Sequence, residues 1–263
     1  MSSGIRRTLH LFALTQVYTW KSFISYRFQS VFWFLSSILQ ALLTFVFVSV
    51  IYQVSTGIPG WGYLQMLLLT SVTIVVTSGV IYLMDIYNIS ESLLMGNFDS
   101  FLTKPMSPYF VFLSSFTGTS AIGGVITGII LFAYAASQLH FGVLNLIAAF
   151  AIFALGILIA LIFVMVLIMG SYKIFRGGGW VNWLFSILGN ITKYPLSIYG
   201  VIGSLLMTFI IPLGFASYYP VEALSGKIGA EGIIVIILLA IAIIFLLSRI
   251  FEYLFKSYSS AMG

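Results

Sequence analysis

Hydrophobic and polar positions alternate along this chain in long blocks. Apolar runs of about 20 residues or more recur over its whole length, and a helix needs a run of about that length to cross a hydrocarbon core. The predicted spans lie near residues 29–52, 63–84, 109–137, 143–170, 178–194 and 232–253. These runs are apolar on every side, whereas the strands of a membrane barrel alternate between apolar and polar residues. The pattern therefore predicts an all-α polytopic membrane protein with six transmembrane helices.

The N-terminal stretch 1–28 has a mixed pattern. Apolar residues recur at helical spacing between Ile5 and Ile24, while Arg7, His10 and Lys21 fall largely elsewhere. This spacing predicts an amphipathic helix in the membrane interface. A cleaved signal peptide is the alternative, but Lys21 and Arg27 interrupt the apolar run and no small-residue cleavage site follows.

The region before the last span allows two interpretations. Pro195, Pro212 and Pro220 interrupt an apolar stretch that is too long for one helix. In one interpretation the fifth span runs from about residue 178 to 194, and 195–220 forms a broken apolar hairpin. In the other, the span covers about 198–215 and the preceding segment lies in the interface. Both give a single net crossing.

Composition supports the membrane class and excludes several chemistries. Charged residues make up 6% of the chain, against about 25% in soluble domains. There is no cysteine, and the only histidines are His10 and His140, so we expect neither a disulfide nor a metal site. The net charge of +5 is spread over loops, which indicates membrane orientation and not nucleic-acid binding.

The basic residues predict the orientation. Nine lie on the side of the two termini if there are six crossings, and only Lys193 and Lys227 lie opposite. The nine are Arg6, Arg7, Lys21, Arg27, Lys104, Lys173, Arg176, Arg249 and Lys256. Because positive charge collects on the cytoplasmic side, we expect a protein of the cell membrane with both termini in the cytoplasm.

Catalytic and ion-coupling chemistry is sparse in the sequence. No ionisable residue falls inside a predicted span; Asp85, Lys193, Arg249 and Glu252 lie at span ends. This weighs against an ion-coupled transporter, a charged channel or an aspartate protease. Catalytic motifs and a phosphate-binding loop are also missing. We therefore expect no enzyme activity, and any ATP with its Mg²⁺ must be bound by another chain.

Residues 85–108, which we call the polar segment, gather charge and turn residues between two apolar spans. Ser90 or Ser92 can cap a short helix, apolar side chains follow, and Pro105 and Pro108 force an extended exit. Helix–helix connections are commonly about 2–8 residues long, so this length favours docking onto a partner over an ordinary connector.

Small residues in the third predicted span indicate close helix packing. Gly118, Gly124 and Gly128 include one pair at four-residue spacing, a spacing that lets helices approach closely. Packing within the chain and a subunit interface are both compatible with this pattern.

Two stretches resemble one branch of the ABC-2 type permeases, the membrane subunits of ATP-binding-cassette exporters. In "LLMGNFDSFLTKPMSPYF" the similar residues are Gly96, Asp99, Leu102, Pro105 and Pro108. In "KYPLSIYG" and "FIIPLGFASYYPVEAL" they are Tyr194, Pro195, Pro212, Phe215 and Pro220. The resemblance extends over essentially the whole chain.

The resemblance implies a coupling helix within the polar segment, which docks onto an ATPase subunit. Its expected contact residues are Glu91, Leu94, Gly96, Phe98, Asp99, Phe101, Lys104 and Pro105. It also implies an outer re-entrant gate over 195–220, which favours the first model of the fifth span. Two permease subunits, identical or related, and two ATPase chains would export a hydrophobic or amphipathic substrate. The alternatives are a scaffold or immunity-type membrane protein and a secondary transporter.

Overall fold

The chain folds into a bundle of long helices. The computed structural model describes residues 2–55, 57–102, 107–115, 117–175 and 179–258, and the described residues contain no strand. The long helices are α1 (Ser2–Ser25), α2 (Arg27–Val54), α3 (Tyr63–Leu83), α7 (Ile122–Ser137), α8 (Val143–Phe175) and α12 (Ala230–Lys256). Short helices connect them: α4 (Ile86–Leu94), α5 (Asp99–Leu102), α6 (Pro108–Ser115), α9 (Gly179–Ile191), α10 (Gly200–Phe209) and α11 (Tyr218–Leu224). The predicted all-α class is confirmed.

Five of the described helical segments are long and apolar enough to cross a membrane. They correspond to α2, α3 continued into α4, α7 with the 3₁₀ turn before it, α8 and α12. A sixth crossing exists if α10 and α11, with their flanking 3₁₀ turns, count as one broken span. The chain is therefore a multi-pass membrane protein.

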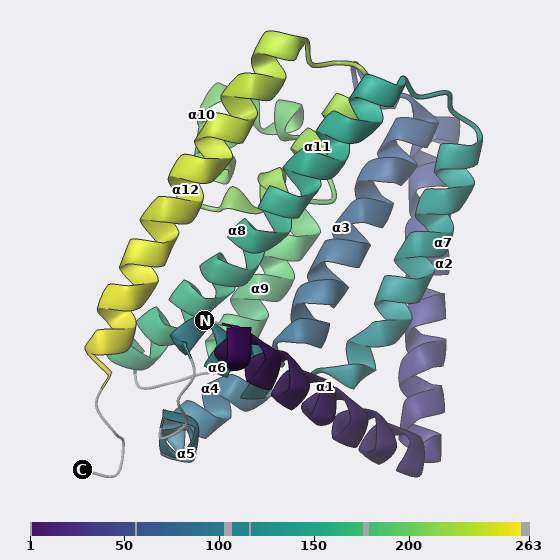
Figure 1. Cartoon of the computed structure of the whole chain (residues 1–263). Helices are drawn as coiled ribbons and strands as arrows, with labels where there is room; N and C mark the ends of the chain where they lie inside the picture. Colours follow the sequence, from purple (N-terminus) through teal and green to yellow (C-terminus); the bar gives the residue numbers. More distant parts are fainter. Residues whose placement is uncertain (1, 56, 103–106, 116, 176–178, 259–263) are drawn as a thin grey trace.

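The two ends of the bundle differ. Figure 1 shows the start of α1 and the end of α12 at one end, together with α4, α5 and α6; we call this the proximal end. The opposite, distal end holds α10, α11 and the start of α12. There Lys227 Nζ donates a hydrogen bond to the Gly60 carbonyl at 2.6 Å, which joins the loops before α12 and α3.

Helix α1 lies across the proximal end (Figure 1) and is hydrogen-bonded to the bundle. Gln16 Nε2 donates to Thr117 Oγ1 at 2.8 Å, and Trp20 Nε1 donates to the Tyr82 hydroxyl at 3.1 Å. Tyr82 in turn donates to Gln16 Oε1 at 3.0 Å. These bonds attach α1 to the proximal end of α3 and to the start of the α7 segment.

The third predicted span, near 109–137, is divided in the structure. Helix α6 ends at Ser115, and α7 begins after a 3₁₀ turn, η1 (Thr119–Ala121). The Gly118 amide donates to the Tyr82 carbonyl at 3.0 Å, and a Cβ at Gly118 would collide with the Ile81 carbonyl. A helix through this point would lose that backbone contact with α3, which explains the division.

The segment between α9 and α12 folds back into the bundle. Two 3₁₀ turns, η2 (Leu196–Tyr199) and η3 (Pro212–Phe215), flank α10. The arms Leu196–Phe209 and Pro212–Leu224 meet at an angle of 83°. We call residues 196–224 the bent segment. A Cβ at Gly156, near the middle of α8, would collide with the Phe215 carbonyl, so η3 lies deep against α8.

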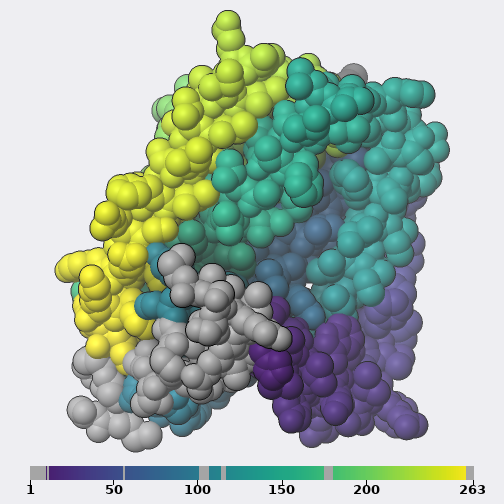
Figure 2. All heavy atoms as spheres, viewed as in Figure 1, coloured from purple at the N-terminus to yellow at the C-terminus, as the bar shows by residue number. Residues whose placement is uncertain are grey.

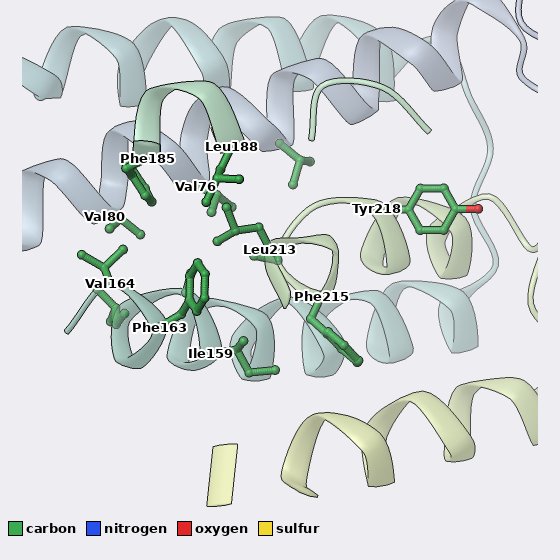
Figure 3. Packing of buried hydrophobic residues seen from close by; sticks show 14 of the residues in the cluster. Val76, Val80, Ile159, Phe163, Val164, Phe185, Leu188, Leu213, Phe215 and Tyr218 are labelled. Carbon is green, nitrogen blue, oxygen red and sulfur yellow. The ribbon is translucent and has the colours of Figure 1, made fainter. Parts of the chain in front are cut away.

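The core forms where these elements meet. Figure 3 shows Phe185 and Leu188 of α9 beside Val76 of α3, with Leu213 of η3 reaching the same cluster. Phe163 of α8 completes it from the opposite side. Inside a membrane such side chains favour folding through close van der Waals packing, and here that packing fixes the depth of η3.

Candidate functional site

The polar segment begins with a capped helix. Asp85 is the N-cap of α4: its Oδ1 accepts from the Asn88 amide at 3.2 Å and its Oδ2 accepts from Asn88 Nδ2 at 2.7 Å. The expectation that Ser90 or Ser92 caps this helix is wrong, because both are buried inside α4 and Ser90 donates to the Ile86 carbonyl at 2.7 Å. The cap fixes where α4 leaves the end of α3.

A tight turn then reverses the chain between α4 and α5. Gly96 has a φ of 71°, a left-handed conformation that favours glycine. The Phe98 amide donates to the Ser92 carbonyl at 3.1 Å. The Phe98 ring is fully buried, 5.3 Å from the Phe112 ring and 6.1 Å from the Tyr258 ring between centroids. Phe98 therefore anchors the turn to the bundle instead of facing outward.

Asp99 ties the polar segment to the chain that follows α12. The Tyr258 hydroxyl donates to Asp99 Oδ1 at 2.9 Å. Burial raises the pKa of Tyr258, and the hydrogen bond to Asp99 and the charge of that carboxylate raise it further. Tyr258 therefore stays a neutral donor at physiological pH, and Asp99 is a structural acceptor in this conformation.

The exposed rim of the polar segment consists of different residues. Tyr87, Met95, Asn97 and Ser100 are exposed, and Glu91 and Leu94 are half-buried. A groove of about 620 Å³ runs along Glu91, Met95, Gly96, Asn97 and Ser100. Met95 and Asn97 were not among the predicted contact residues. Their signal in the sequence is the neighbouring Gly96, whose turn presents them.

Three predicted contact residues have no described side chain. Phe101 lies in α5, but its side chain is outside what the structure describes. Lys104 and Pro105 lie outside the described residues altogether.

A second concave site lies between α2, α3 and α9, and we call it the α2–α3–α9 cavity. Its volume is about 680 Å³. Apolar side chains form most of its wall, and the polar lining residues are Gln40, Thr44, Thr70, Asn190, Lys193 and Tyr194. Lys193 Nζ donates to Asn190 Oδ1 at 2.8 Å.

The predicted gate residues lie in three separate places. Tyr194 lines the α2–α3–α9 cavity, and the next residue, Pro195, is buried. Pro212 and Phe215 are buried in η3 against α8. Pro220 lines a separate apolar recess of about 400 Å³ between α3, α7, α8 and α11. Figure 2 shows α3 set back between α7 and α8 on this face.

The three predicted packing glycines all face α3. A Cβ at Gly118 would meet Ile81, one at Gly124 would meet Ser78, and one at Gly128 would lie 2.8 Å from Val75 Cγ2. They therefore serve packing between α3 and the α7 segment within one chain.

Comparison with known proteins identifies a family for most of the chain. A family model described as "ABC-2 family transporter protein" matches residues 38–262. That range includes the polar segment, the α2–α3–α9 cavity and the bent segment. No curated protein and no solved structure matches the chain.

Proposed function

Because the chain belongs to the ABC-2 transporter family, we propose that it is the permease subunit of an exporter that separate ATPase chains drive. The family is a membrane transport component and is not itself catalytic. In this proposal ATP and Mg²⁺ are bound by the ATPase subunits, two per complex. The protein lies in the cell membrane with the proximal end in the cytoplasm.

The observation that carries this proposal is the construction of the polar segment. Buried Ile89, Leu93 and Phe98 hold it against the bundle, while Met95 and Asn97 face outward at the proximal end. A rigid helical turn with an exposed apolar and polar tip suits docking into a groove of a partner. Movement of the ATPase would then be transmitted through the Asp99–Tyr258 bond and the aromatic cluster to α6 and α12.

The translocation pathway in this proposal is the α2–α3–α9 cavity, completed by a second permease subunit, identical or related. Helix α2 supports this assignment because only 11% of its most apolar stretch is buried within the chain. A long helix with so little cover inside its own subunit has a broad face for a neighbour or for lipid. The bent segment would close the pathway on the distal side, as a re-entrant gate, when the subunits move.

Co-purification tests the docking role. We expect the tagged chain, extracted from its own cells in mild detergent, to retain an ATP-binding-cassette ATPase and to hydrolyse ATP. Asn97→Arg places a bulky charge at the exposed tip and should reduce the recovered ATPase at least about tenfold, the effect of losing roughly 1.4 kcal/mol of binding. Met95→Glu should act in the same direction.

Glu231→Arg is the matched control, because Glu231 is exposed at the start of α12, at the distal end. It should leave ATPase recovery unchanged. Absence of any ATPase from the wild-type preparation would favour a scaffold or a secondary transporter. Equal recovery with Asn97→Arg and with the control would contradict docking through the polar segment.

A further inference from the structure

The end of α9 lies at the middle of the bundle and not at its distal end. Thr73 Oγ1 donates to the Thr192 carbonyl at 3.0 Å. Thr73 is ten residues from each end of α3 (Tyr63–Leu83), or about 15 Å at 1.5 Å per residue. Helix α3 is about as long as a hydrocarbon core is thick, so Thr192 and the next residue, Lys193, lie near mid-membrane.

The alignment of α2 with α3 places Gln40, on the opposite wall of the cavity, at the same depth. The hydroxyls of Ser49 and Tyr63 lie 3.0 Å apart, which places these residues of α2 and α3 side by side. Gln40 lies nine residues from Ser49 toward the proximal end, or about 14 Å along the helix. Gln40 therefore lies at nearly the depth of Thr73, across the cavity that both Gln40 and Lys193 line.

Lys193 carries a charge at this depth without a carboxylate partner in the cavity. The described lining residues include no Asp or Glu. The ammonium group is held by Asn190, whose amide oxygen is neutral, and this bond turns the side chain back toward α9. A charged residue within a membrane is energetically costly and is a functional site by default when it faces a cavity.

We propose that Lys193 binds the acid group, a phosphate or a carboxylate, of an amphipathic molecule in the α2–α3–α9 cavity. The apolar wall from α2 takes the hydrocarbon part of that molecule. Gln40, Thr44 and Asn190 supply uncharged polar groups beside the acid. This proposal names the substrate class and rests on the proposed function, in which this cavity is the pathway. An anionic lipid and an exported amphipathic acid share this chemistry.

Binding of a matched pair of probes tests the proposal on the full-length chain in phosphatidylcholine nanodiscs. The probes are a fluorescent long-chain carboxylic acid and its methyl ester. We expect the acid to bind the wild-type chain about tenfold more tightly, as one charge-assisted contact of roughly 1.4 kcal/mol gives. Lys193→Met should remove this preference, and Lys193→Arg should retain it.

Lys193→Met is expected to fold, because it replaces a mid-membrane charge by an apolar side chain of similar length. Gln40→Leu provides a second variant that keeps the charge and should weaken binding of both probes without removing the preference for the acid. Equal affinity for acid and ester in the wild type would overturn the proposal, and so would a preference that survives in Lys193→Met.

A lipid arm identifies the source of the acid group. With phosphatidylglycerol in the nanodisc, a lipid occupant should lower the affinity of the acid probe for the wild type but not for Lys193→Met. Unchanged affinity would indicate an exported acid. No ATP is used in these measurements, so loss of the acid preference leaves the permease proposal standing. Conversely, failure to recover an ATPase leaves the binding result valid.

Discussion

At the residue scale, some side chains of the polar segment hold it against the bundle and others face outward. Phe98 and Asp99 have side chains typical of contact residues, an aromatic ring and a charge. Yet Phe98 packs inside the chain's own aromatic cluster, and Asp99 accepts a hydrogen bond from Tyr258 of that cluster. Met95 and Asn97 look unremarkable in the sequence and are the exposed ones. The turn at Gly96, whose φ is left-handed, lies between Met95 and Asn97 and presents both of them, and the chain then returns to the bundle at Phe98.

The Asp99–Tyr258 bond predicts a pH dependence of stability. Because the pKa of Tyr258 is raised on folding, the stability that its neutral hydroxyl contributes is fully present below the unfolded pKa of about 10 and is lost as pH rises toward the folded pKa. Tyr258→Phe should therefore lower the melting temperature at pH 8 and lose less stability than the wild type between pH 9 and 11.

Thermal unfolding in detergent across this pH range measures the effect. Tyr87→Phe is the control, since Tyr87 is exposed on α4, and its stability should follow the wild type throughout. If the melting temperatures of Tyr258→Phe and of the wild type fell in parallel as the pH rises, the Asp99–Tyr258 bond would not contribute to stability.

At the element scale, apolar run length predicts some helices well and others poorly. The bounds of α2, α3, α8 and α12 lie within a few residues of the predicted runs, because each run ends in a turn or at polar residues. The run near 109–137 carries Ser, Thr and Gly residues at 114–120, which membrane helices also use for close packing, so its division depends on the backbone of α3 beside Gly118. Such a tertiary contact has no signature in local sequence.

The depth at which α9 ends in the membrane is, like the division of the third span, a feature that the sequence did not predict. Lys193 follows α9 and was expected at a span end on the outer side. The end of α9 lies level with Thr73, because α9 has 13 residues and the bent segment occupies the remaining depth. The cavity and its mid-membrane lysine therefore became visible only from the packing of α2, α3 and α9.

Contact between η3 and α8 predicts the effect of one substitution. Gly156→Ala places a methyl group where the Phe215 carbonyl lies, and overpacking of this kind costs about 1–3 kcal/mol. We expect lower stability and displacement of the bent segment. Gly79→Ala is the matched control, because nothing lies within 4 Å of its Cβ position and alanine favours a helix by about 0.5–1 kcal/mol.

Melting temperatures of the two variants in the same detergent measure this difference. Gly156→Ala should melt below the wild type, and Gly79→Ala at or above it. Close packing of η3 on α8 would be refuted if both variants melted together.

At the scale of the whole molecule, the two ends have separate tasks in the proposed transport cycle. The proximal end carries the polar segment, α1 and the aromatic cluster around Phe112 and Phe251, which joins α6 to α12. The distal end carries the bent segment. Helix α8 contacts both α4 and η3, so a displacement at the polar segment has a continuous packed route to the distal side.

This division requires opposite ends to face opposite sides of the membrane. The chain has no cysteine, so single cysteines can report on each end. His10 and Glu231 are exposed at the proximal and distal ends, so burial does not limit their labelling. In intact cells a membrane-impermeant maleimide should label Glu231→Cys and not His10→Cys, and permeabilisation should expose both. Labelling of both cysteines in intact cells would exclude six crossings, and labelling of His10→Cys alone would invert the orientation and place the polar segment away from cytoplasmic ATP.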